Sequence, residues 1–394
     1  MAGSYLVAGA RTPIGKLSGA LSSLSASDLA GIAIKAALER AGVAPDKVDH
    51  ALVGTVVFAG QGQVPCRQAA VKGGLPLSVP SNTLNKACLS GLNAIYLADQ
   101  MIASGDADIV VAAGMESMSS APYILPGARG GFRYGNSELH DALLIDGLMC
   151  AFEVCQMGES TERFAASAGI SRQAQDDVAA RSHERAAAAI KDGRFEAEIV
   201  PVPVPQRKGD PVLVETDEGV RPGTTAESLG ALKPAFSTSG NITAGNASQI
   251  SDGASAIVVM SQKAVDQLGV SPLGQVVSYG MVAGPDNFSL LSQPSNALRQ
   301  ALGKANLKVS DLDLIEINEA FAAVAIQSMA DLGVTEEIVN VNGGAIALGH
   351  PVGMSGNRLA LTMLHELKRR GGGTGGVALC GGGGQGDAMV LKTL

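Results

Sequence analysis

The chain has 394 residues, 46 % of them hydrophobic, and its formal net charge is −8 at pH 7. This length exceeds what one hydrophobic core usually serves, so it predicts two or three domains. The acidic balance, the lack of tryptophan and the scarcity of other aromatic residues argue against nucleic acid or an anionic membrane as a partner. Fifty glycines favour an α/β protein with many tight turns between strands and helices.

The cysteines are odd in number, and no two of them stand in a Cys-x-x-Cys pair. This pattern predicts neither a disulfide framework nor a zinc site, and it favours reduced thiols in a cytoplasmic protein. The first residues lack a basic segment followed by a long apolar stretch, and no apolar stretch is pure enough to span a bilayer. We therefore expect neither a secretory signal nor a membrane span. The five cysteines are Cys66, Cys88, Cys150, Cys155 and Cys380.

In the first part of the chain, apolar residues recur at helical spacing over 90–103, and Gly105 ends the pattern. Cys88 stands at the start of this predicted helix. Backbone N–H groups at a helix N-terminus favour negative charge, so we expect the pKa of this thiol to be lowered and the thiol to act as a nucleophile. The alternative is a small buried residue, which is common for a free cysteine.

The middle of the chain, 121–249, is more polar and irregular than the rest. It contains one clear predicted helix over 171–190, capped by Ser171 and stopped by Gly193, and a proline-punctuated extended stretch over 200–214. An insertion of this length usually forms a lid or a binding subdomain.

In the last part, an apolar strand is predicted to end at Asn318, which could hold a water or a carbonyl oxygen, or could cap a helix. A glycine-rich loop over 343–356 carries His350 between a glycine and a proline, which constrain its backbone. The alternative for His350 is a capping or core histidine. A metal ligand is not indicated, because no other histidine has ligand spacing with it.

Cys380 follows the short apolar strand 377–379 and opens a glycine run. Gly381, Gly383 and Gly386 match Gly-x-Gly-x-x-Gly, but only eight residues follow, too few for the helix and strand of a dinucleotide site. Glycines here more plausibly let backbone amides approach a reacting carbonyl.

The two ends of the chain repeat each other. Ser90-Gly91 matches Ser355-Gly356 at an offset of 265 residues, and Gly54 matches Asn318 at an offset of 264. Two α/β halves of like design would bring loops at equivalent strand ends together, and such clefts are where open α/β sheets bind ligands. We therefore expect Cys88 to meet His350 and Cys380.

These segments together resemble the thiolases, and among them the acetyl-CoA acetyltransferases. The resemblance covers the chain end to end and is carried by the segments 11–15, 85–92, 114–119, 243–248, 318–321, 343–356 and 380–386. It implies the thiolase α/β fold, with two pseudo-symmetric α-β-α-β-α halves and an inserted loop domain. It places the N-terminal half at 1–120 plus 250–271, the loop domain that binds coenzyme A at 121–249, and the C-terminal half at 272–394.

The resemblance also implies roles for particular residues. Cys88 would be the acylated nucleophile, His350 its activator and Cys380 the acid/base that moves the α-proton of a second acyl-CoA. Asn318 would fix a water that forms one oxyanion hole with His350, and the N–H groups of Cys88 and Gly382 would form the other. The implied coenzyme A contacts are Leu148, Met157, Arg221, Ser228, Ala244, Gly245, Ser248 and Phe321.

The implied activity is the reversible condensation of two acetyl-CoA to acetoacetyl-CoA and CoA, through an acetyl-cysteine. These thioesters are substrates, and no metal or further cofactor is expected. Fatty-acid or lipid metabolism and a homotetramer, a dimer of dimers, are implied in the same way.

Four positions depart from the commonest family pattern and bear on pantetheine contact and acyl-chain preference: Gln156, Gln249, Ser251 and Met354. The alternatives are a broader-chain 3-ketoacyl-CoA thiolase of β-oxidation, a ketoacyl synthase, and an idle acyl-CoA-binding relative. The cysteine in a glycine run argues against the synthase, and the intact set of four catalytic residue types argues against the idle protein.

Overall fold

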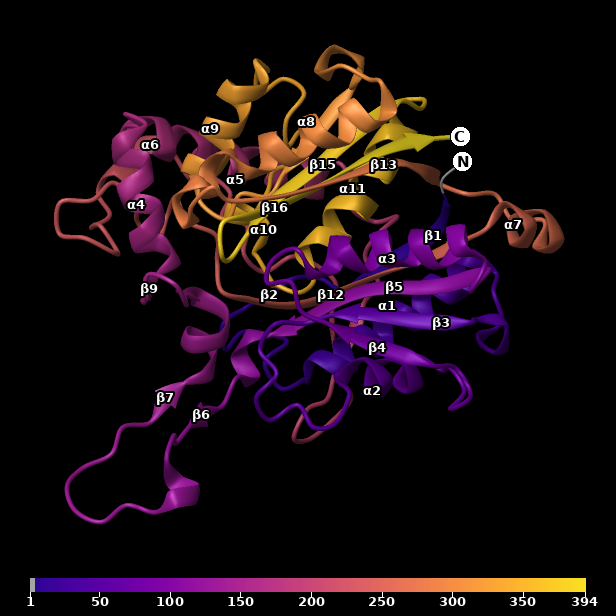
Figure 1. Ribbon diagram of the computed structural model, residues 1–394, viewed down its shortest axis with the longest axis horizontal. Helices are drawn as coiled ribbons and strands as arrows, with labels where there is room; N and C mark the ends of the chain where they lie inside the picture. The colour runs from indigo at the N-terminus through magenta and orange to yellow at the C-terminus, as the bar shows by residue number, and fades with distance from the viewer. Residues whose placement is uncertain (1–3) are drawn as a thin grey trace.

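The computed structural model describes residues 4–394, apart from the side chains of 287 and 288. Its N-terminal half is a five-stranded sheet with helices on both faces (Figure 1). The strands are β1 (Tyr5–Arg11), β3 (His50–Gly54), β4 (Ser81–Leu84), β5 (Ile109–Ser117) and β12 (Ser251–Met260), with the short β2 (Gly15–Lys16) beside β12. The helices are α1 (Ala26–Ala41), α2 (Pro65–Lys72), α3 (Ser90–Ser104) and α7 (Gln262–Leu268).

The C-terminal half repeats this plan. Its strands are β13 (Gly274–Ala283), β14 (Leu314–Ile317), β15 (Thr374–Gly381) and β16 (Gln385–Thr393). Its helices are α8 (Gln293–Ala305), α9 (Ala322–Leu332), the single turn α10 (Ala345–Leu348) and α11 (Ser355–Arg369). Hydrogen bonds join the two sheets edge to edge, since Tyr5 and Leu6 of β1 pair with Gln275 and Gly274 of β13. The strand order is therefore continuous from β14 through β15, β16, β13, β1, β12, β5 and β3 to β4.

Three hydrophobic clusters hold five layers of secondary structure together. One packs α1 and α2 against the outer face of the N-terminal sheet, and another packs α8 and α9 against the outer face of the C-terminal sheet. Between them, α3 and α11 fill the space between the two sheets, where Leu92, Ile95, Leu361 and Leu364 are fully buried. The predicted α/β class is confirmed. The α-β-α-β-α layers are formed by the two halves together and not by each half, because each half contributes one sheet and its helices, and α3 and α11 share the central layer.

The internal repeat is visible in the central pair of helices. α3 and α11 begin at Ser90 and Ser355 and end at Ser104 and Arg369, so both ends differ by the same 265 residues. The helices touch where each carries a glycine: a Cβ added at Gly91 would lie 2.8 Å from the backbone nitrogen of Asn357, and one at Gly356 would lie 2.5 Å from that of Leu92. Only glycine permits this approach, which brings the N-terminal ends of both helices to one place.

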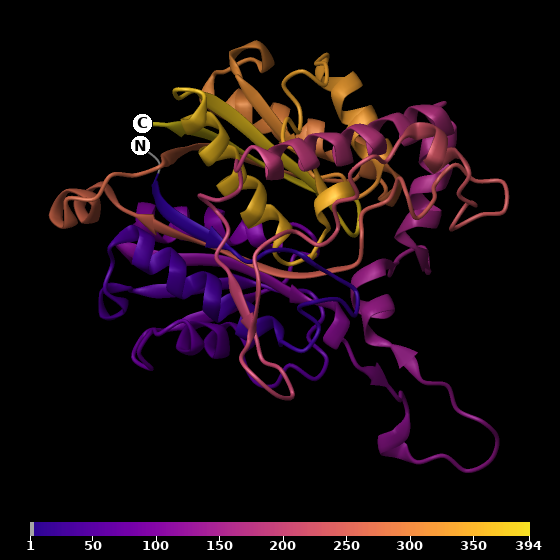
Figure 2. The same ribbon diagram turned by 180° about the vertical axis from the view of Figure 1, so that it is seen from behind.

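The middle of the chain forms a separate layer of helices and hairpins. Its helices are a π-helix (Leu143–Leu148), α4 (Met157–Ser167), α5 (Arg172–Lys191) and α6 (Ala226–Gly230). Its strand pairs are β6 (Tyr123–Ile124) with β7 (His140–Asp141), β8 (Met149–Cys150) with β9 (Cys155–Gln156), and β10 (Val202–Val204) with β11 (Val212–Val214). The β6–β7 hairpin extends away from the body in Figure 1, and α5 runs along the C-terminal half in Figure 2.

A buried ion-pair network fastens this middle region to the N-terminal sheet. Arg11 of β1 is fully buried, and its guanidinium contacts Asp217 at 2.7 Å and Glu198 at 2.6 Å, both in the middle region. The same guanidinium lies 5.1 Å from the ring centre of Phe195. Each charge is thus paired out of water, which a buried charge requires.

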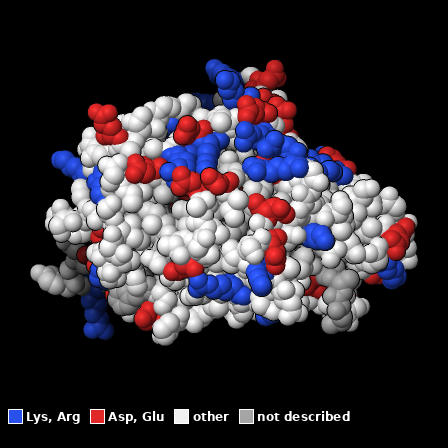
Figure 3. Space-filling model, turned by 90° about the horizontal axis from the view of Figure 1, so that it is seen from above, with Lys and Arg blue, Asp and Glu red and all other residues white. Residues whose placement is uncertain are grey.

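The surface has mixed charge. Lys and Arg side chains alternate with Asp and Glu on the face shown in Figure 3. No helix within residues 4–394 combines the length and the apolar character needed to cross a membrane.

Candidate active site

Cys88 lies in a tight loop between β4 and α3, and hydrogen bonds hold this loop on both sides of the thiol. Ala87 adopts a left-handed φ of 49°, and its N–H donates to the Asn85 side chain at 3.0 Å. The Ser90 hydroxyl accepts from the Lys86 N–H at 2.8 Å and donates to the Ala87 carbonyl at 2.6 Å. The loop therefore has one shape, with the half-buried Cys88 at its tip.

Lys86 ties the Cys88 loop to the opposite half of the molecule. Its ammonium lies 2.8 Å from the buried carboxylate of Asp387 in β16, which also accepts a hydrogen bond from Tyr279. Asp387 stands across the hairpin from Leu379, the residue before Cys380. This ion pair therefore fixes the two cysteine-bearing segments relative to each other.

The Cys88 sulfur faces the glycine run of the other half. Burial raises the pKa of Cys88 to about 11, the Glu116 carboxylate adds to the shift, and the N–H groups of Cys88 and Gly382 oppose it by hydrogen-bonding to the sulfur. The expectation that the helix N-terminus lowers this pKa is wrong, because desolvation outweighs the few N–H dipoles. Cys88 is a protonated thiol at neutral pH in the free protein.

Cys380 lies within β15, and the glycines after it form the turn to β16. Cys380 pairs with Gly386 across this hairpin, and Gly383 and Gly384 at its tip adopt left-handed φ values of 77° and 65°. The thiol is 2 % exposed. Burial raises its pKa, and the charge of Cys88 raises it further, so the two sulfurs are close enough to influence each other.

His350 is buried, and both ring nitrogens have partners. Nδ1 lies 2.5 Å from the Ser355 hydroxyl, and Nε2 lies 3.4 Å from the side-chain nitrogen of Asn318. Burial lowers the pKa of His350 to about 4, and the Arg358 charge lowers it further. The imidazole is neutral at physiological pH and can accept a proton. Ser355 stands five residues after His350 and was noted from sequence only as part of the internal repeat, because nothing there marks it as a partner of His350.

Asn318 does not cap a helix: α9 begins after Phe321, so that alternative is wrong. The side chain of Asn318 is fully buried and contacts His350 through its nitrogen. Its oxygen has no hydrogen-bond partner among the described residues. A buried amide oxygen in this condition requires a partner such as a water or a substrate group.

Three of the four departures from the commonest pattern support the backbone around His350. The Gln249 carbonyl and the Ser251 hydroxyl both accept from the His350 N–H, each at 3.2 Å. The Gln249 side chain donates to carbonyls of Gly219 and Ile346, and thereby joins the middle region to the His350 loop. Met354 is fully buried under this loop, whereas Gln156 is exposed.

Four of the eight predicted coenzyme A residues line one pocket of about 210 Å³ between α6 and the His350 loop. These are Arg221, Ser228, Ala244 and Gly245. His183 and Gln249 line the same pocket, and the His183 ring accepts a hydrogen bond from the Arg221 N–H at 3.1 Å. Burial and then the Arg221 charge lower the pKa of His183 to about 4, so this histidine is neutral there. His183 was not predicted as a pocket residue, and Gln249 was noted from sequence only as a departure that bears on pantetheine contact.

The other four do not line this pocket, and three of them share an apolar cluster with one of the two thiols. Leu148 packs in the same apolar cluster as Cys88. Met157 and Phe321 belong to the cluster that contains Cys380. Ser248 donates its N–H to the Ala320 carbonyl at 3.0 Å, next to Phe321. The structure therefore brings four of the eight predicted residues together in one pocket, and the roles of all eight stay predictions.

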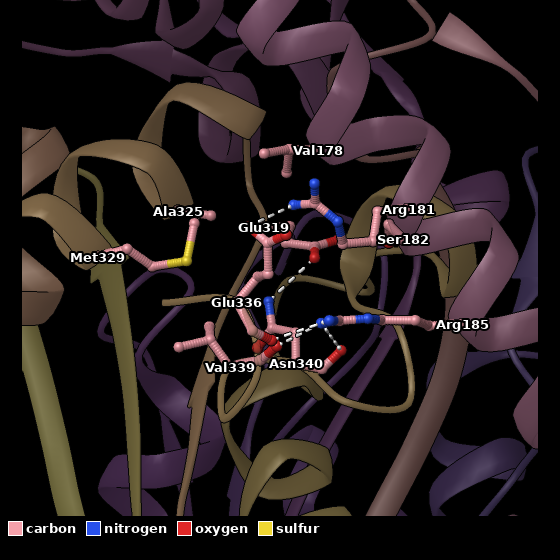
Figure 4. Close-up of a pocket in the computed structure, with 10 residues that line it drawn as sticks. All are labelled: Val178, Arg181, Ser182, Arg185, Glu319, Ala325, Met329, Glu336, Val339 and Asn340. Carbon is pink, nitrogen blue, oxygen red and sulfur yellow. Dashed lines mark hydrogen bonds and ion pairs between the residues drawn. The ribbon is translucent and has the colours of Figure 1, made fainter. Parts of the chain in front are cut away.

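Glu319, next to Asn318, stabilises the fold by joining three segments of the chain through hydrogen bonds. Its buried carboxylate accepts from Ser182 at 2.6 Å and from Asn340 at 2.9 Å (Figure 4). It also accepts from the Ile346 N–H at 3.2 Å. The cavity beside it measures about 20 Å³, which is room for roughly one water. This cavity is too small for an acyl group. Within the described part of the chain, no three His, Cys, Asp or Glu side chains gather as a metal site.

Comparison with known proteins agrees with this geometry. A model of the thiolase N-terminal domain matches residues 4–263, and a model of the thiolase C-terminal domain matches residues 270–393. The chain belongs to the thiolase family. It is 54 % identical to the "Probable acetyl-CoA acetyltransferase" of Mycolicibacterium smegmatis, over 98 % of its own length and 100 % of the length of that protein. It is 53 % identical to the protein of the same name from Mycobacterium tuberculosis over the whole of both chains, and 50 % identical to the "Acetyl-CoA acetyltransferase" of Cupriavidus necator over 98 % of each.

Proposed function

We propose that this thiolase is an acetyl-CoA C-acetyltransferase. It joins two acetyl-CoA to form acetoacetyl-CoA and CoA, and it catalyses thiolysis in the reverse direction. The observation that carries the proposal is the convergence of two thiols from opposite halves, with a buried neutral imidazole in hydrogen-bond contact with Asn318. The names of the full-length relatives support the acetyl group as the unit transferred.

The first half-reaction is the acylation of Cys88. Its thiol gives a proton to the neutral His350 as the sulfur attacks the carbonyl carbon of acetyl-CoA. The thiolate of CoA leaves, takes the proton of the Cys380 thiol, and the acetyl-cysteine remains. A sulfur nucleophile suits this step because it is also a good leaving group when the second acyl unit arrives.

The second half-reaction forms the carbon–carbon bond. The Cys380 thiolate left by the first half-reaction removes a proton from the methyl group of a second acetyl-CoA, and the enolate attacks the carbonyl carbon of the acetyl-cysteine. The bond from that carbon to the Cys88 sulfur breaks, and the departing Cys88 thiolate takes back the proton held on His350. The N–H groups of Cys88 and Gly382 are suited to hold one oxyanion, and His350 with a water on Asn318 the other. Removing one such donor typically costs about 3–4 kcal/mol of barrier in acyl-transfer enzymes.

Two substitutions test these assignments. Cys88→Ser abolishes condensation if the covalent intermediate forms there, and Cys66→Ser, another buried cysteine in α2, serves as the matched control with activity retained. Cys380→Ala keeps acetyl transfer to Cys88 but loses deuterium exchange into the methyl group of acetyl-CoA. Full condensation by the Cys88 variant, or persistent exchange in the Cys380 variant, contradicts the proposal.

We extend the proposal to the setting of the enzyme: a homotetramer in the cytoplasm that acts in fatty-acid and lipid metabolism. Sedimentation at several protein concentrations tests the tetramer. A thiolysis series with 3-ketoacyl-CoA substrates of increasing chain length, run beside the condensation assay, separates this activity from that of a broader-chain thiolase.

A further inference from the structure

The hairpin of β8 and β9 carries two cysteines that the thiolase reaction does not use. Cys150 and Cys155 are register partners in this antiparallel pair, and the turn 151–154 joins them. Val154, a β-branched residue, takes a left-handed φ of 53° in that turn, and its N–H donates to the Cys150 carbonyl at 2.9 Å. These contacts hold the two cysteines directly opposite each other.

The geometry of an antiparallel pair suits a disulfide. Residues directly opposite have Cα atoms about 4.5–5.5 Å apart, and disulfides accept Cα separations of about 4.4–6.8 Å. Side chains of opposite residues also project from the same face of the hairpin. Both thiols are free in the structure, at 4 % exposure for Cys150 and 8 % for Cys155. A bond between them therefore needs side-chain rotation and no change in strand register.

The Cys155 sulfur lies beside charged side chains and below a solvent-exposed turn, a setting that permits thiol–disulfide exchange. This sulfur lies 3.5 Å from an Arg163 guanidinium nitrogen and 3.7 Å from a Glu153 carboxylate oxygen. Burial raises the pKa of Cys155, and Arg163 opposes that shift. The turn above the pair is open to solvent, since Phe152 is 73 % and Val154 76 % exposed. A small oxidant can thus reach the pair from the turn.

We propose that Cys150 and Cys155 form a reversible disulfide by exchange with a low-molecular-weight disulfide. The Cys155 thiolate attacks one sulfur of the oxidant, the oxidant's S–S bond breaks and one thiolate leaves. The Cys150 thiolate then attacks the Cys155 sulfur of the mixed disulfide and expels the second thiolate. The two cysteines are oxidised, the oxidant is reduced to two thiols, and these take up the two cysteine protons. A dithiol reductant reverses the reaction.

The position of the hairpin gives this bond a consequence. Leu148 directly precedes β8 and Met157 directly follows β9, and both are predicted contacts of the acyl-CoA. Phe152 in the turn packs against Gly383, next to Gly382. The disulfide would hold the β8–β9 hairpin, and with it these two predicted acyl-CoA contacts, in one conformation. This consequence rests on the proposed function, whereas formation of the bond does not.

Peptide mapping tests the bond itself. The intact protein is incubated with bis(2-hydroxyethyl) disulfide, blocked with iodoacetamide, and cleaved after glutamate, which separates Cys150 in 139–153 from Cys155 in 154–159. The expected product is the two peptides joined by a disulfide, lost on reduction with dithiothreitol. In Cys150→Ser the reaction should stop with half of the oxidant on 154–159. Two alkylated peptides, or two separate adducts, in the wild type would overturn the proposal, whatever happens at Cys88 and Cys380.

Hydrogen exchange tests the effect on the hairpin. Amides of 149–156 should exchange severalfold more slowly in the oxidised protein than in the reduced one, because opening the hairpin exposes them. Cys150→Ser treated with the same oxidant should show no such slowing. Equal exchange in oxidised and reduced wild type would mean that the bond fixes nothing, and would overturn that part of the inference.

Discussion

Substitution of Ser355 by alanine tests how the protein sets the protonation of its catalytic imidazole. The Ser355 hydroxyl has one proton and lies 3.0 Å from the Pro351 carbonyl, to which it donates. It therefore accepts from His350 Nδ1 at 2.5 Å, and this tautomer leaves Nε2 unprotonated and available to the Cys88 proton. Ser355 is 2 % exposed, so no bulk water replaces the lost oxygen. A buried donor without its acceptor costs about 1–3 kcal/mol.

If that cost falls on the reactive tautomer, Ser355→Ala lowers the rate of Cys88 acylation by about 5- to 150-fold, since 1.36 kcal/mol corresponds to a factor of ten. The assay is the burst of CoA released from acetyl-CoA, followed in parallel with thermal unfolding. Ser328→Ala is the matched control, because Ser328 is buried and donates to the Leu291 carbonyl at 2.9 Å, remote from the thiols. Ser355→Thr keeps the hydroxyl and should restore most of the rate. An acylation rate for Ser355→Ala within about twofold of the wild type would refute the reasoning.

Three further predictions concern the thiol, the buried ion pairs and the helix contact. Alkylation of Cys88 by iodoacetamide in the free enzyme should accelerate about tenfold per pH unit between pH 7 and 9, because the raised pKa keeps the thiol protonated there; a plateau in that range would mean a thiolate already formed. Arg11→Met should lower the free energy of unfolding in urea by about 3–5 kcal/mol, since it leaves the buried Asp217 unpaired, whereas Lys263→Met at an exposed ion pair should leave the urea midpoint nearly unchanged; equal urea midpoints for the two variants would contradict this. Gly91→Ala places a Cβ 2.8 Å from α11 and should destabilise the protein by about 1–3 kcal/mol, measured by the same titration; an unchanged midpoint would mean that the helices separate freely.

Much of the fold could be predicted from local sequence patterns, which do not depend on contacts with distant parts of the chain. The predicted helix over 90–103 is α3 over Ser90–Ser104, and the one over 171–190 is α5 over Arg172–Lys191, because apolar spacing and capping are local signals. The offset of 265 residues predicted two like halves. It could not predict that β1 and β13 pair edge to edge, because a sequence repeat does not show which strands lie at the edges of the two sheets.

The site was less predictable where the burial and the neighbours of a side chain determine its pKa or its contacts. A helix start after Cys88 suggested that the pKa of its thiol is lowered. Burial and the charge of Glu116 raise this pKa instead, and a sequence gives no measure of how far a side chain is desolvated. Asn318 suited a helix cap by residue type, yet α9 starts four residues later and the side chain turns to His350 instead. His183 and Gln249 reach the pocket from elements far apart in the chain, so no motif joins them.

The pKa directions constrain how such a site can work. Burial disfavours the thiolate at Cys88 and the imidazolium at His350 alike, so the resting pair is neutral. Because both groups are neutral, no charged group has to be desolvated when a neutral thioester replaces the water around them. The proton must then move as the sulfur attacks, when negative charge develops on the carbonyl oxygen. Fixed N–H groups such as those of Cys88 and Gly382 stabilise that charge without reorganising, which is the condition under which a high thiol pKa is compatible with fast acyl transfer.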